Sequence, residues 1–72
     1  MNEYKIELTS PIDRENLVVE IWLGENLLAE LNTENGFLEL EIYPIDQKII
    51  KVEYEKFIVA LNIARNKLTL NK

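Results

Sequence analysis

Residues 17–52, with the sequence LVVEIWLGENLLAELNTENGFLELEIYPIDQKIIKV, decide the fold of this chain. Apolar stretches in this segment alternate with turn-forming residues, as in antiparallel strands joined by short loops. The strongest turn signal is Asn35-Gly36, because a type I′ hairpin turn needs positive φ at both of its central residues. We therefore predict a hairpin between strands at residues 27–33 and 37–43.

This hairpin fixes which side chains share a face of the sheet. Because successive side chains of a strand point to opposite faces, the turn position alone selects the apolar set. The resulting pairs include Thr33–Leu38, Leu31–Leu40 and Ala29–Ile42. One face of the predicted hairpin is therefore a core face.

A second turn lies at residues 24–26, where we expect a three-residue loop with Asn26 in the left-handed conformation. A two-residue loop would place Glu20 on the apolar face, so the longer loop is preferred. The resulting pairs are Leu23–Leu27, Ile21–Ala29 and Val19–Leu31. Both turns then lead to the same apolar face, which is the consistency expected of a real sheet.

Besides the strand at residues 17–23 that this second turn implies, two more strands are expected, one before the segment and one at its end. Residues 3–9 alternate between apolar and charged side chains and form a first strand, whose register the long connection after it leaves open. After a turn at residues 44–48, residues 49–52 form a fifth strand. This strand places Lys51 beside Glu41.

The period of the apolar residues then changes from 2 to 3.6, which indicates an amphipathic helix. Its apolar positions are Tyr54, Phe57, Ile58, Leu61, Ala64 and Leu68. We expect a single α+β domain over residues 1–72, a four- to five-stranded antiparallel β-meander with one C-terminal α-helix packed on one face. The predicted core is Val19, Ile21, Ala29, Leu31, Leu40, Ile42, Phe57 and Leu61.

The composition limits the partners of this domain. The 72 residues include 13 acidic and 8 basic side chains, a formal net charge of −5. This charge argues against nucleic acid and anionic membrane surfaces, which bind through Lys and Arg, and it favours a basic protein. The chain has no cysteine and no apolar run long enough to span a membrane, so we expect a cytoplasmic protein.

Catalytic chemistry has little support in the sequence. The chain has no His and no Cys, and its one serine, Ser10, precedes a proline with no base nearby in sequence. Two separated glycines build no phosphate loop. We expect no enzyme activity, no cofactor and no metal, although three facing glutamates could bind a divalent cation or supply a glycosidase pair.

The sheet face away from the helix is the unusual surface. The predicted register places Glu20, Glu30 and Glu41 side by side across three strands, where like charges repel one another. A second row holds Trp22, Leu28, Tyr43 and Ile49, and a third holds Val18, Asn32, Glu39 and Glu53. The glutamates are either ordinary polar residues of solvated strands or part of a partner-binding surface. The residues predicted to bind a partner are Glu20, Trp22, Glu30, Glu39, Glu41 and Tyr43.

Three segments carry a resemblance to a family. Residues 14–22 (RENLVVEIW), 38–44 (LELEIYP) and 57–64 (FIVALNIA) look like a group of small bacterial proteins, some of which resemble immunity proteins of interbacterial toxin systems, including contact-dependent growth inhibition. The resemblance implies a cytoplasmic inhibitor that binds a toxin domain, often a basic nuclease. It places no binding residues.

The leading prediction is a protein-binding module, most concretely an immunity protein that binds and neutralises a toxin domain. Mutual repulsion of the glutamate row would then be relieved by basic residues of the partner. The alternative is a structural or accessory protein that forms a homodimer through Trp22, Leu28, Tyr43 and Ile49.

Overall fold

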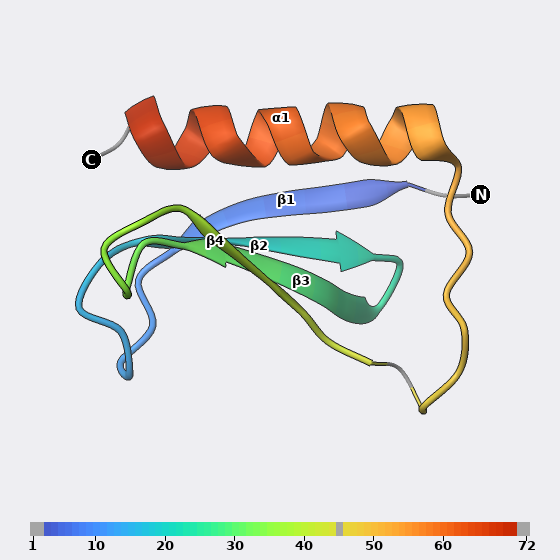
Figure 1. Ribbon diagram of the computed structural model, residues 1–72, viewed down its shortest axis with the longest axis horizontal. Helices are drawn as coiled ribbons and strands as arrows, with labels where there is room; N and C mark the ends of the chain where they lie inside the picture. The colour runs from blue at the N-terminus through green and yellow to red at the C-terminus, as the bar shows by residue number, and fades with distance from the viewer. Residues whose placement is uncertain (1–2, 45, 71–72) are drawn as a thin grey trace.

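Four antiparallel strands and one helix make up the part of the chain that the computed structural model describes, residues 3–44 and 46–70. In chain order these are β1 (Tyr4–Thr9), β2 (Val18–Leu23), β3 (Asn26–Asn32), β4 (Glu39–Ile42) and α1 (Tyr54–Leu70). Each strand pairs with the next, and α1 lies on one face of the sheet (Figure 1). The predicted α+β meander with one C-terminal helix is confirmed.

The hairpin between β3 and β4 has the predicted register but a different turn. Leu31 pairs with Leu40 as expected, and Ala29 with Ile42. The turn closes one residue early, where the Gly36 N–H donates to the Thr33 carbonyl at 3.1 Å. Only the glycine has positive φ, at 88°, so the predicted type I′ turn is wrong. The glycine in the left-handed conformation supplies one extra residue after the turn, so the strands keep the predicted register although the turn closes one residue early.

The turn between β2 and β3 is also shorter than predicted. Leu23 pairs with Asn26, which leaves two residues in the turn, with Gly24 at a φ of 61°. A bulge between the Ile21 and Trp22 pairs absorbs the extra residue. The predicted pairs nearer the strand centre, Val19–Leu31 and Ile21–Ala29, are therefore confirmed although the three-residue loop is wrong.

The predicted fifth strand is absent from the described residues. Residues 49–53 have no regular structure, and the side chain of Ile49 is 86% exposed. Asp46 and Gln47 both have positive φ, as in a tight hairpin turn, and Lys48 forms an isolated bridge, but residues 49–53 do not continue as a strand beside β4. Residue 45 of the predicted turn lies outside the described residues. Strand β4 is consequently an edge of the sheet, as is β1.

The core lies between α1 and the centre of the sheet. Its buried members are Val19, Ile21, Ala29 and Leu31 from the sheet and Ala64 and Leu68 from the helix, with Leu40 and Leu61 partly buried against them. Phe57 is half-buried, and its ring lies 5.9 Å from that of Tyr4. Most of the predicted core is therefore correct.

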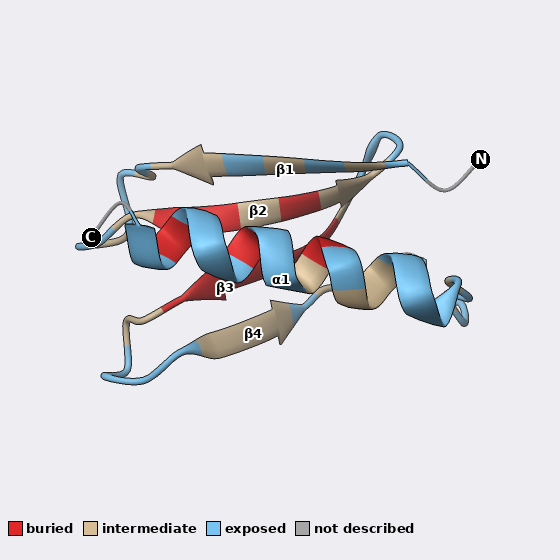
Figure 2. Ribbon diagram, turned by 90° about the horizontal axis from the view of Figure 1, so that it is seen from above, coloured by how far each residue is buried: buried red, intermediate tan, exposed pale blue. Residues whose placement is uncertain are grey.

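One predicted core position, Ile42, is wrong because of where the helix lies, and its side chain is 65% exposed. Tyr54, which was predicted on the apolar side of the helix, is 70% exposed. Within the described residues, α1 approaches β1, β2 and β3 but not β4 (Figure 2). A helix about 10 Å wide spans only about two strand spacings, so it leaves an edge strand uncovered. No helix in the described ranges is long and apolar enough to cross a membrane.

Candidate functional site

A row of glutamates crosses the whole sheet on the face away from α1. Glu7 pairs with Glu20, Glu20 with Glu30, and Glu30 with Glu41. Sequence reasoning predicted the last three of these neighbours but missed Glu7, because the register of β1 depends on the irregular connection between β1 and β2. The alternation in β1 does place Glu7 among its polar residues. The row therefore has one carboxylate from each strand.

Arg14 forms ion pairs with the two glutamates of this row that lie on β3 and β4. The connection that carries it lies below the sheet, on the side away from α1 (Figure 1). Its Nη2 atom lies 3.1 Å from Glu30 Oε2 and 3.2 Å from Glu41 Oε2. The side chain of Glu30 is only 8% exposed. Lys51, which was expected beside Glu41, lies instead on the irregular segment after β4.

Neutral donors complete what we call the Arg14 cluster, which consists of Arg14, Glu30, Asn32, Glu41 and Tyr43. The fully buried amide of Asn32 donates to Glu30 Oε2 at 2.9 Å and to Glu41 Oε2 at 2.8 Å. The Tyr43 hydroxyl donates to Glu41 Oε1 at 3.1 Å. Buried carboxylates are tolerated when such partners satisfy them. The repulsion predicted in this row is relieved by the protein's own side chains.

The hydrogen bonds of the cluster shift two pKa values. The amide of Asn32, the Tyr43 hydroxyl and the charge of Arg14 together lower the pKa of Glu41 below its usual 4.5, against the opposing effect of burial. Burial, followed by the hydrogen bond to Glu41, raises the pKa of Tyr43 to about 12. Both shifts favour the protonation states that this network needs, an ionised carboxylate and a neutral phenol.

The other predicted binding residues fall into separate groups. Trp22 is half-buried, donates from Nε1 to Glu20 at 3.1 Å, and has the Lys5 ammonium 5.6 Å from its ring centre. Glu39 accepts a hydrogen bond from the Asn35 amide at 2.7 Å. The predicted apolar row does not form a surface, because Leu28 is buried and Ile49 is on no strand. The structure thus gathers only Glu30, Glu41 and Tyr43 of the six.

An exposed apolar surface lies instead along β4. We call it the β4 strip, and it consists of Phe37, Leu38, Leu40 and Ile42. Leu40 and Ile42 share the helix-facing side of β4, a strand that α1 does not approach, although Leu40 is partly buried against the core. Leu38 precedes β4 and lines a hollow together with Arg65 and Thr69 of α1. Phe37, Leu38 and Ile42 are 60%, 42% and 65% exposed. Adjacent exposed apolar residues of this size are typical of interaction surfaces. The sequence contained a signal for this exposed surface, because it predicts only one helix and a single helix is too narrow to cover four strands.

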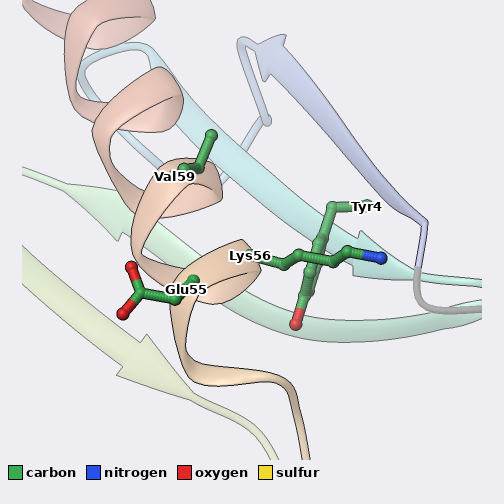
Figure 3. Close-up of a pocket in the computed structure, with 4 residues that line it drawn as sticks. All are labelled: Tyr4, Glu55, Lys56 and Val59. Carbon is green, nitrogen blue, oxygen red and sulfur yellow. The ribbon is translucent and has the colours of Figure 1, made fainter.

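Small hollows border the sheet and the helix. One of about 290 Å³ lies beside the first turns of α1 and is lined by Tyr4, Glu55, Lys56 and Val59 (Figure 3). The polar ends of Glu55 and Lys56 point to different sides of the helix (Figure 3), and the hollow brings no nucleophile together with a base. Among the described residues, no group of three or more His, Cys, Asp or Glu side chains is placed to hold a metal ion.

No family model, curated protein or solved structure matches this chain significantly. The functional argument therefore rests on the sequence and on the surfaces described above.

Proposed function

We propose that this chain is a protein-binding module that binds a basic protein through the surface along β4. The observation that carries the proposal is the exposure of Phe37, Leu38 and Ile42, which lie on or directly before an edge strand of the sheet. Glu39 and Glu41 lie on the opposite face of the same strand. A partner at this edge would therefore meet apolar side chains on one side and carboxylates on the other.

The charge of the whole chain supports a basic partner. Its formal net charge is −5, and Arg14 offsets only part of the charge of the glutamate row. Opposite charge on a partner speeds encounter and disfavours acidic competitors. In concrete terms, we propose a cytoplasmic immunity protein that neutralises a toxin domain, as the family resemblance suggests.

Self-association is the alternative function, and the β4 strip supports it better than the face away from α1. The face away from α1 offers less apolar area than its sequence predicts, because Leu28 is buried and Arg14 covers the centre. A homodimer would have more apolar surface to bury along the β4 strip. Sedimentation of the free protein at micromolar concentration distinguishes the two functions. A homodimer through the β4 strip should sediment as a dimer, whereas a chain that keeps this strip for another protein should sediment as a monomer.

Growth rescue tests the proposed function directly. A toxin encoded beside this chain should arrest growth in a suitable host, and co-expression of the chain should restore it. Ile42→Lys should abolish the rescue, because it puts a positive charge at the edge that meets a basic partner. Ile12→Lys is the matched control, because Ile12 is fully exposed in the connection between β1 and β2. Equal rescue by both variants would show that the partner uses another surface.

A further inference from the structure

We propose that the occupant of the β4 edge is an extended segment of the partner, with alternating basic and apolar residues, which adds to the sheet as an antiparallel fifth strand. This inference rests on the proposed function, because it uses the same surface. It goes further by assigning the mode of binding and the chemistry of the bound segment.

The backbone of β4 supplies the first part of the argument. The Tyr43 N–H donates to the Leu28 carbonyl at 2.9 Å, so the polar backbone groups of Tyr43 point toward β3. Along a strand these groups alternate in direction. Those of Glu41 therefore also point toward β3, whereas the N–H and C=O groups of Leu40 and Ile42 point away from the sheet. An edge with free groups of this kind is a template for another strand.

The helix-facing side of this edge suits apolar side chains. Leu38 and Ile42 are exposed there, and Leu40 lies between them. Next to Ile42 is a hollow of about 180 Å³ with an apolar lining that includes Ile50, Val52 and Phe57. A hollow of this size can receive a side chain of the added strand. Every second residue of the bound segment should therefore be apolar.

The other side of the edge suits basic side chains. Glu39 receives a hydrogen bond only from the exposed Asn35 among the contacts seen in the described residues. Glu41 is held by the Arg14 cluster, but its side chain remains 32% exposed. Because side chains alternate between faces, the residues between the apolar ones would lie beside these carboxylates. Lysine or arginine at those positions complements the charge.

The same charges argue against a second copy of this chain as the occupant. An antiparallel β4–β4 pair that places Leu40 opposite its own copy would also place Glu39 opposite Glu41 of the other copy, twice. Like charges directly opposite each other destabilise a strand pair. The other edge of the sheet is less suitable for strand addition, because Lys5 and Glu7 form an exposed ion pair on β1.

Amide exchange measured by NMR with a defined peptide tests the inference. The probe is a capped peptide of about seven residues, alternating lysine and valine, a length typical of strands. On binding, exchange at the Leu40 and Ile42 amides should slow by about tenfold or more, whereas the Glu41 and Tyr43 amides should already be slow. Binding without this change at Leu40 and Ile42 would overturn strand addition while leaving a role for the surface.

Modified peptides and one variant sharpen the result. In an antiparallel pair the peptide groups that face β4 belong to the valines, so N-methylation of the valines should abolish binding and N-methylation of the lysines should not. A peptide with glutamate in place of lysine should not bind. Ile42→Pro removes one outward N–H and is tolerated on an edge strand, so it should weaken binding. Ile42→Val keeps the N–H and should leave binding unchanged.

The failures of the two proposals can be distinguished. Absence of peptide binding at millimolar concentration overturns strand addition, whereas growth rescue that survives Ile42→Lys overturns the proposed surface. Concentration-dependent protection of Leu40 and Ile42 in the free protein would show that a second copy occupies the edge, which also overturns the inference.

Discussion

Along β4, the Arg14 cluster and the β4 strip lie on opposite faces of the sheet, yet the cluster is covered and the strip is exposed. In the cluster, one arginine and two neutral donors satisfy two facing glutamates, and Glu30 is almost completely buried. In the strip, Ile42 lies opposite a fully buried alanine but remains 65% exposed. Polarity therefore does not decide which surface is available to a partner.

Coverage by other elements accounts for the difference. Arg14, on the connection between β1 and β2, pairs with Glu30 of β3 and Glu41 of β4, so this part of the charged face is covered by the protein itself. The single helix follows the middle of the sheet and leaves β4 without cover (Figure 2). The apolar face is closed only where the helix lies. This comparison can be tested with matched pairs of variants.

The largest expected difference is in the loss of unfolding free energy between substitutions at Leu31 and at Ile42, two residues that the sequence places on the same apolar face. Leu31 is 6% exposed, so Leu31→Ala should lower the free energy of unfolding by about 2–5 kcal/mol through lost burial and a cavity. Ile42→Ala should lower it by less than about 1 kcal/mol. Denaturant unfolding measures both. Equal effects would mean that the helix covers β4 after all.

The next effect compares two basic residues. Arg14→Met should lower the melting temperature by roughly 10 °C, because it leaves Glu30 buried beside Glu41 without a cation. Lys51→Met should leave the melting temperature nearly unchanged, since Lys51 lies exposed on the irregular segment after β4. Thermal unfolding followed by circular dichroism gives both values. A destabilised Lys51→Met protein would favour the originally predicted fifth strand.

A smaller effect concerns acid. The pKa of Glu41 is lower in the folded protein than its usual 4.5, so its ionised form stabilises the fold above that value. This stabilisation is lost as the pH falls from about 4.5 through the lower folded pKa. Glu41→Gln should therefore flatten the fall in unfolding free energy at acidic pH. Identical pH profiles for the variant and the natural chain would show that Glu41 is not held by the cluster.

Much of this fold could be predicted from the sequence because successive side chains of a strand point to opposite faces, so the apolar pattern selects the register. The pairing of Leu31 with Leu40 survives an incorrect turn type, since a left-handed glycine restores the spacing. The pairing of Ile21 with Ala29 survives an incorrect loop length, since a bulge absorbs the extra residue. Errors of one residue at a turn are thus corrected within the hairpin.

The candidate surfaces were harder to predict, for two physical reasons. Arg14 reaches Glu41 across 27 residues of sequence from an irregular connection, and no periodicity reports such a contact. Helical periodicity also gives the apolar stripe of α1 only approximately, so the predicted stripe includes Tyr54, which is exposed, and omits Ala60, which is buried. The sequence indicates which residues share a face but not which part of that face is covered.

Hydrogen exchange along β4 in the free protein tests the central claim most directly, that this strand is an open edge. The amides of Glu41 and Tyr43 point toward β3 and should exchange slowly, whereas those of Leu40 and Ile42 should exchange at least about tenfold faster. The comparison needs no substitution and no partner. Uniformly slow exchange at all four amides in a dilute, monomeric sample would contradict the account, because it would mean that another part of the chain already pairs with this edge.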